Sequence, residues 1–199
     1  MPRVILTLFL SILSTNLIAA DKYDIDTGHS HVGFAVKHML VSTVKGNFKE
    51  FSGSIMYAPD DLSKSSVSIT IKSASIDTDS ERRDNHLRSD DFFNAEMYPE
   101  ITFASKKIEK RGEAYVAIGE MTIRDVTKEI EIPFEVAGPV PGRRGSQLIG
   151  VDAAFEINRQ DYGVKYSQTL DTGGLAVSNE VRIEVHVEAI HRLETAEKN

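Results

Sequence analysis

The fold class is decided by the stretch Val181-Arg182-Ile183-Glu184-Val185-His186-Val187-Glu188-Ala189-Ile190. Apolar side chains occupy its odd positions from 181 to 189, and polar side chains occupy the positions between them. Because successive side chains of a strand point to opposite faces, this period of two predicts a strand with one buried face and one wet face.

The same alternation recurs along most of the chain. Segments rich in Gly, Pro and Asp separate the alternating runs, and such segments suit hairpins between antiparallel neighbours. The pattern predicts an all-β chain of eight or nine strands. Besides 181–190, they are residues 23–26, 32–36, 46–57, 67–72, 101–108, 113–124, 129–136 and 151–157, with a turn at 138–145.

Two segments break this rhythm. Residues 78–94 contain a capping box made by Thr78 and Glu81 and an Asp84/Arg88 pair four positions apart, which predicts a helix. Residues 163–179 are rich in glycine and predict a long loop.

Amphipathic strands must hide their apolar faces, either by stacking as a sandwich or by closing as a barrel. Closure also removes exposed strand edges. An eight-stranded barrel can be filled by its own side chains or can hold one small ligand. Periodicity alone leaves these alternatives open.

The first twenty residues have the layout of a secretory signal peptide, with Arg3, an apolar run over 4–12 and the pair Ala19-Ala20. We expect residues 1–20 to be removed, and an uncleaved anchor is the alternative. One domain over residues 21–191 and a polar tail over 192–199 would follow, with no later membrane span.

Composition excludes several classes of function. The chain has no cysteine, so disulfides, reactive-thiol chemistry and zinc–thiolate sites are absent. Its formal net charge is −7 and its basic residues are scattered, which argues against nucleic acid as a partner. A hydrophobic or neutral small-molecule partner fits better.

No catalytic motif is present, and we expect the protein not to be an enzyme. An enzyme stays open as an alternative, because catalytic triads assemble from residues distant in sequence. His29 and His31, with His38 further along, could ligate a metal or haem if the first two share a strand face. The alternative is that they form local hydrogen bonds, and we expect no metal and no cofactor.

Aromatic residues come from nearly every predicted element, including the pair Phe92-Phe93 between the predicted helix and the break at Tyr98-Pro99. They could form an ordinary core or line an elongated apolar tunnel capped by the helix.

Several blocks of sequence, in a fixed order, cover essentially the whole segment after residue 20. With these blocks the chain resembles the YceI-like family of lipocalin-like, polyisoprenoid-binding proteins. The blocks are His29–His38, Gly46–Phe48, Ser75–Thr78, Arg83–Ser89, Asp91–Phe93, Tyr98–Ser105, Gly119–Lys128 and Ile157–Gly163.

The resemblance implies an extended eight-stranded antiparallel barrel with a short helical cap and a long apolar pocket. It also implies a periplasmic protein that transports or stores an isoprenoid quinone, a polyprenyl lipid or a fatty-acyl amphiphile, and it brings no catalytic residues. A haem- or metal-binding envelope protein that uses the N-terminal histidines is the alternative, and a homodimer is compatible with the sequence.

Asp125 departs from the family at a turn where glycine is common, so we expect Asp125 to take the left-handed conformation.

A pocket of this kind has a predicted lining drawn from many strands and from the cap. The predicted ligand-binding residues are Phe34, Val36, His38, Phe48, Phe51, Ile55, Ile69, Ile71, Leu87, Phe92, Phe93, Phe103, Ile132, Phe134, Phe155, Tyr166 and Val185. Arg88, Ser105 and Arg159 are further candidates for polar groups near its entrance.

Overall fold

The computed structural model describes residues 20–39, 41–167 and 176–192. Within them the chain forms eleven strands, one α-helix and five short 3-10 turns. The strands are β1 (Asp21–Ile25), β2 (His31–His38), β3 (Ser42–Phe48), β4 (Phe51–Tyr57), β5 (Ser66–Lys72), β6 (Ile76–Asp77), β7 (Glu100–Arg111), β8 (Ala114–Ile123), β9 (Val126–Pro141), β10 (Gln147–Asn158) and β11 (Val177–His191). The helix is α1 (Glu81–Arg88), and the 3-10 turns are η1 (Thr27–His29), η2 (Leu62–Lys64), η3 (Ser73–Ser75), η4 (Arg143–Gly145) and η5 (Arg159–Tyr162).

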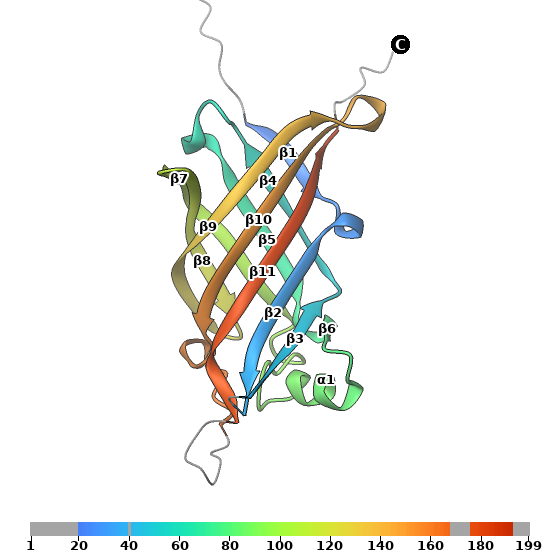
Figure 1. Ribbon diagram of the computed structural model, residues 1–199, viewed down its shortest axis with the longest axis vertical. Coiled ribbons are helices and arrows are strands. Elements are labelled where there is room, and N and C mark those ends of the chain that lie inside the picture. Colours follow the sequence, from blue (N-terminus) through green and yellow to red (C-terminus); the bar gives the residue numbers. More distant parts are fainter. Residues whose placement is uncertain (1–19, 40, 168–175, 193–199) are drawn as a thin grey trace, which may run out of the picture.

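Eight antiparallel strands close into a tall barrel, as the family resemblance implied (Figure 1). Their order around the barrel is β1-β4-β5-β7-β8-β9-β10-β11, and β11 returns to β1 through the pairs Asp24↔Ile190 and Ile25↔Ala189. Further down, β11 pairs instead with β2, which continues the sheet through β3 to β6. Figure 1 shows α1 at the lower end, beside β3 and β6.

The alternation read from the sequence sets which side chains point inward. On β10, the inward-facing Ala153 lies between Val185 of β11 and Phe134 of β9. Its neighbour Ala154 faces outward and is exposed. The apolar phase of each strand therefore lines the barrel interior, and the polar phase faces water.

Gly119 allows β7 and β8 to approach closely beside the register shift at Ser105/Lys107. An added Cβ would overlap the Ala104 carbonyl oxygen and lie 2.6 Å from the Ser105 Cα. Because backbone cannot yield cheaply, Gly119→Ala is expected to lower the free energy of unfolding by about 1–3 kcal/mol or more in urea titrations.

The matched control is Gly150→Ala, where the nearest atom to an added Cβ is the Ala137 Cβ at 4.0 Å. It should change the free energy of unfolding by less than about 1 kcal/mol. Equal losses for the two variants would contradict this account of Gly119.

The predicted single strand over 46–57 is wrong, because β3 ends at Phe48 and β4 begins at Phe51. The Lys49 N–H donates to the Ser75 carbonyl oxygen (3.1 Å) and the Glu50 N–H to the Ser75 Oγ (3.1 Å). These bonds hold the two residues in a turn instead of in a strand ladder.

The helix is shorter than predicted, because α1 spans only 81–88 of residues 78–94. The predicted capping box is also wrong, because the N-cap is Ser80. The Thr78 backbone N–H (2.9 Å) and its Oγ1 (2.5 Å) instead donate to Oδ1 of Asp84, which is buried.

The predicted Asp84/Arg88 pair does not form. Arg88 donates from Nε to the Ala74 carbonyl oxygen (2.7 Å) and from Nη2 to the Ile76 carbonyl oxygen (2.8 Å). Its guanidinium therefore ties the helix to the segment before it.

Two predicted loop boundaries are also wrong. The turn predicted at 138–145 begins later, because β9 continues to Pro141. Residues 177–179 of the predicted loop belong to β11, and positions 168–175 lie outside the described residues.

Most of both predicted terminal segments also lies outside the described residues, which include only Ala20 of the predicted signal peptide and Arg192 of the predicted tail. Within the described part of the chain, no helix has the length and apolar character needed to cross a membrane.

Candidate functional site

Two apolar chambers lie inside the barrel. The lower chamber, near α1, has a volume of about 120 Å³, and the upper chamber has a volume of about 130 Å³. Each is on the order of ten times the space that one water molecule needs. The lower chamber is lined by Val32, Gly33, Phe34, Val36, Phe48, Ile71, Leu87, Phe92, Phe93, Ile101, Met121, Ile123, Ile157, Arg159, Val164, Val177, Val181 and Ile183.

The upper chamber is lined by side chains from β-strands alone, within the described residues. These are Ile25, Val32, Ile55, Val67, Ile69, Ile71, Ile101, Thr102, Phe103, Ile108, Ala117, Met121, Ile132, Phe134, Val151, Ala153, Phe155, Ile183, Val185 and Val187.

Five residues line both chambers: Val32, Ile71, Ile101, Met121 and Ile183. We call these five residues the waist. They come from β2, β5, β7, β8 and β11, so the waist surrounds the barrel axis. The two chambers therefore adjoin one another as parts of one tunnel.

The tunnel is not filled by its own side chains. Phe34, Ile69, Phe155 and Val185 point inward and are still only partly buried. A packed core would cover such side chains almost completely. The interior therefore offers apolar surface to a guest molecule.

The segment after α1 caps the lower end. Phe93 meets Phe48 edge-on, with ring centroids 5.9 Å apart, and Phe48 in turn contacts Phe34 at 5.9 Å. The Phe92 carbonyl oxygen accepts a hydrogen bond from Nη1 of Arg124 (3.1 Å), which also donates to the Gly163 carbonyl oxygen (2.9 Å).

Arg124 occupies this position because it takes the left-handed conformation at the β8–β9 turn, with φ 57°. The sequence predicted that conformation for Asp125, which is wrong: Asp125 has no positive φ. The turn thus aims the Arg124 guanidinium at the cap, which the sequence pattern did not reveal.

A third cavity, the vestibule, adjoins the lower chamber and has a volume of about 200 Å³. It shares Phe34, Val36, Leu87, Phe92 and Val177 with the lower chamber, so it forms the tunnel's lower opening. Its other lining residues are His38, Val44, Arg83, His86, Tyr166 and Ala176.

Three rings pack together in the vestibule. His86 meets Phe92 and Tyr166 edge-on at 5.0 Å each, and Phe92 and Tyr166 lie 4.8 Å apart. Phe92 is only 7% exposed, so it belongs to the packed cap as well as to the tunnel wall.

The structure brings together every residue of the predicted lining except one. Phe51 borders none of the three cavities and packs against the buried core instead. Contact of the remaining residues with a ligand stays a prediction.

Several lining residues were missed. Val181, Ile183 and Val187 share the alternation of Val185, and that signal could have found them. Ala117 and Ala153 also line the upper chamber, but such small side chains give little hydrophobic signal in the sequence.

Among the described residues that line the lower chamber, Arg159 is the one that is charged, and it is only 5% exposed. Its guanidinium donates to the backbone carbonyl oxygens of Ser178 (2.9 Å), Val164 (2.8 Å) and Val177 (3.4 Å) and to Oδ1 of Asn179 (3.3 Å). Burial lowers the pKa of Arg159 from its ordinary value, because a charge is costly away from water.

The other entrance candidates are not equivalent. His38 lies in the vestibule, whereas Arg88 and Ser105 border none of the three cavities. The Ser105 Oγ accepts a hydrogen bond from the Val67 N–H (2.8 Å), next to the β7 register shift.

The three N-terminal histidines do not converge. His29 lies in η1, His31 begins β2 and His38 ends it, so the predicted shared strand face of His29 and His31 is wrong. The His31 ring stacks on the ring of His186, with centroids 6.4 Å apart.

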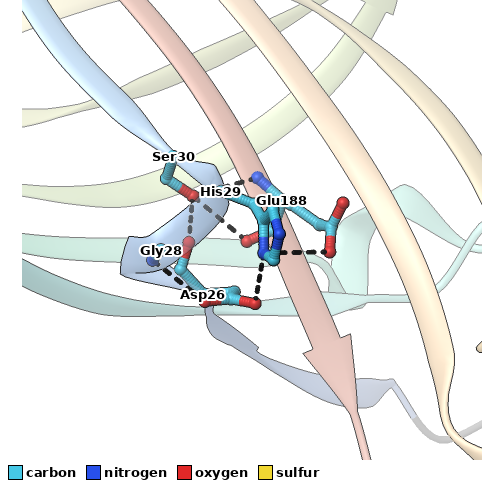
Figure 2. A network of polar contacts seen from close by, with 5 residues as sticks. All are labelled: Asp26, Gly28, His29, Ser30 and Glu188. Atoms are coloured by element: carbon cyan, nitrogen blue, oxygen red, sulfur yellow. Dashed lines mark hydrogen bonds and ion pairs between the residues drawn. The ribbon is translucent and has the colours of Figure 1, made fainter. Parts of the chain in front are cut away.

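His29 instead joins a surface network with Asp26 and Glu188 (Figure 2). Its Nδ1 lies 2.9 Å from Asp26 Oδ2 and 3.9 Å from Glu188 Oε1. The Ser30 Oγ donates to the Asp26 carbonyl oxygen (2.6 Å) and accepts from the Glu188 N–H (3.1 Å). The network fastens η1 to β11.

The pKa of His29 is raised above its ordinary value, first by the hydrogen bond to Asp26 and then by the nearby carboxylates. We expect an NMR titration to give a pKa above about 6.5, and Asp26→Asn to return it toward that value. Since the folded-state pKa is raised, the stabilisation from this group is present below about pH 6.5 and is lost as the pH rises through the folded-state pKa. An unchanged His29 pKa in Asp26→Asn would contradict the role of this pair.

A closed antiparallel barrel with an apolar tunnel defines the class of lipocalin-like barrels. The YceI-like domain matches residues 23–189, and the chain belongs to the YceI-like family. It is 38% identical over 152 residues to a UPF0312 protein of Photorhabdus laumondii, covering 76% of this chain and 79% of that protein.

Solved structures agree with this assignment. The fold is similar to that of BcnA from Burkholderia cenocepacia, with a TM-score of 0.74 and 28% identity over 83% of this chain and 99% of that one. It also resembles a polyisoprenoid binding domain from Saccharophagus degradans, with a TM-score of 0.65 and coverage of 85% and 98%. At 16% identity, the second likeness concerns the fold alone.

Proposed function

We propose that the protein binds one long-chain lipid with its apolar tail inside the tunnel. The observation that carries this proposal is the partly uncovered apolar inner face around two adjoining chambers. A hydrocarbon chain that covers this inner face removes apolar surface from water, and that transfer lowers the free energy of the complex.

Energetics favour a long tail over a small aromatic ligand. Burial contributes about 0.8 kcal/mol per CH₂, so one five-carbon isoprene unit contributes roughly 3–4 kcal/mol. Association costs about 4–15 kcal/mol, and micromolar affinity needs a net of roughly −8 kcal/mol. Several isoprene units must therefore enter the barrel.

The candidate ligands are an isoprenoid quinone, a polyprenyl lipid and a fatty-acyl amphiphile. The Saccharophagus degradans domain of similar fold is named a polyisoprenoid binding domain, which supports the isoprenoid quinone and the polyprenyl lipid as candidates. We propose transport or storage in the periplasm, supported by family membership and by the signal-like pattern of residues 1–20. The apolar lining supports binding over catalysis.

Extraction of the protein purified from its native host tests this proposal. Mass spectrometry of the extract should find a prenyl or acyl lipid in about one-to-one ratio with the protein. Repeated preparations without lipid, together with no uptake of added prenyl lipids, would reject it.

Phe93→Asp is expected to weaken lipid retention by about tenfold or more while the barrel stays folded. Phe93 faces the lower chamber and is only partly buried, so a carboxylate there stays hydrated until a lipid tail displaces the water. Lipid release and circular dichroism measure the two effects.

Met97→Asp is the matched control for Phe93→Asp. Met97 lies in the same segment, is 66% exposed and borders none of the three cavities. It should retain lipid normally. Unfolding of Phe93→Asp would show instead that Phe93 is an ordinary core residue.

A further inference from the structure

The vestibule differs in charge from the rest of the protein. Among the described residues, its lining includes Arg83, His38 and His86, and Arg159 lines the adjoining lower chamber. None of the described residues that line these two cavities is acidic, although the chain has a formal net charge of −7. Two arginines therefore line the lower end of the tunnel, with no acidic residue among the described lining.

Arg83 is held in place by neutral partners. Its Nε donates to Thr78 Oγ1 (2.7 Å) and its Nη2 to the Thr78 carbonyl oxygen (2.6 Å). The Thr78 hydroxyl donates in turn to Asp84, which is buried behind it. The Nε and Nη2 donors lie on one edge of the guanidinium, so these two bonds fix its orientation. Among the described contacts, Arg83 forms no ion pair with a carboxylate.

The two histidines complete the site in different ways. His86 Nε2 lies 2.8 Å from Asp91 Oδ2, so this ring already has a carboxylate partner. His38 is exposed in the vestibule, and no described contact pairs its ring with a carboxylate. The ring cluster of His86, Phe92 and Tyr166 supplies an apolar border next to these polar groups.

Arg159 adds charge deeper inside. Its N–H groups face backbone carbonyl oxygens and an amide oxygen, so its positive charge has no anionic partner among the described contacts. In the low-dielectric surroundings of the tunnel, this charge attracts an anion more strongly than it would in water. It acts at a distance, without needing to touch the anion.

We propose that the vestibule binds the anionic head group, a phosphate or a carboxylate, of the lipid whose tail occupies the tunnel. This inference rests on the proposed function and deepens it by selecting acidic amphiphiles over neutral ones. Arg83 supplies charge-assisted hydrogen bonds to the head group. Phe92 and Tyr166 contact the first carbons of the tail.

The experiment compares three ligands with the same twenty-carbon prenyl tail: the monophosphate, the carboxylic acid and the alcohol. Direct binding to the delipidated full chain should be about tenfold tighter or more for an anion than for the alcohol. Preference for the monophosphate or for the acid would each support the proposal and would distinguish a prenyl phosphate from a fatty acid as the source.

Arg83→Gln should remove most of this preference, because the affinity for the anions falls toward that for the alcohol. Arg82→Gln is the matched control, because Arg82 is the exposed neighbour on α1, borders none of the three cavities and changes the net charge equally. Circular dichroism reports whether each variant is folded.

Three outcomes would overturn the proposal. If the anions bind no better than the alcohol, the vestibule does not distinguish a charged head group from a neutral one, and the proposal of lipid binding is unaffected. If Arg82→Gln lowers the preference as much as Arg83→Gln, the effect is a general one of net charge. If none of the three ligands binds, the proposed lipid function fails as well.

Discussion

Ala153→Phe is expected to lower the affinity for long prenyl tails by about a hundredfold or more and to leave short tails bound. Ala153 lines the upper chamber between Phe134 and Val185. That chamber measures about 130 Å³, and an apolar cavity of roughly 150 Å³ accepts a benzene ring. The new phenyl ring would occupy most of it.

The size of the effect follows from the tail segments excluded. Losing one isoprene unit removes roughly 3–4 kcal/mol of burial, and about 1.4 kcal/mol corresponds to a tenfold change in affinity. Affinity should increase with the length of a prenyl alcohol up to a limit. We expect the variant to reach that limit at a shorter tail than the wild type.

Ala154→Phe is the matched control for Ala153→Phe. Ala154 is the next residue on β10, faces outward and is exposed. It should bind all tail lengths normally. If Ala153→Phe weakens short and long tails equally, the upper chamber does not hold the far end of the lipid.

Arg159→Met is expected to lower the free energy of unfolding by about 3–5 kcal/mol. The variant leaves the carbonyl oxygens of Val164, Val177 and Ser178 without their donor. Hydrogen bonds from a charged group contribute roughly 1.5–3 kcal/mol each, and water entering the vestibule offsets part of the loss. Urea titrations measure the difference.

Two further variants sharpen this test. Arg159→Lys should lose less, because an ammonium group can reach some of the acceptors but not all of them. Arg182→Met removes an exposed arginine that pairs with Glu184 at 2.9 Å, and it should cost less than about 1 kcal/mol. If Arg159→Met costs no more than this control, Arg159 does not fasten the lower end of the barrel.

The strands were predictable from the sequence because their signal is local. Alternation in β10 and β11 identifies both the strand and the face that points inward. The helix was predicted too long because Thr78 and Glu81 match a capping box by their spacing in sequence. In the folded chain Thr78 bonds to Asp84 itself, and no spacing rule distinguishes these two pairings.

The site was predictable in its apolar part and only partly in its polar part. Large residues on the inward phase, such as Phe34 and Phe155, follow from alternation. Arg159 and His38 were among the predicted polar residues, whereas Arg83 was missed. Arg83 lies on the polar helix α1 and bonds locally to Thr78, a pattern that also suits an ordinary solvated helix face. The division of the tunnel by the waist depends on which strands face each other across the barrel, and a single strand pattern carries no such information.

Closure through β1 has a consequence for how the chain folds. The first described strand pairs with β4 and also with the end of β11, the last described strand. The meander from β7 to β11 can form from sequential hairpins, but the ring is complete only when β1 joins both neighbours. Such a contact between distant parts of the chain slows folding, because the intervening loop must lose its entropy first. We therefore expect the barrel to close late, where β1 and β2 join β11, so that its apolar interior stays open along that side until then.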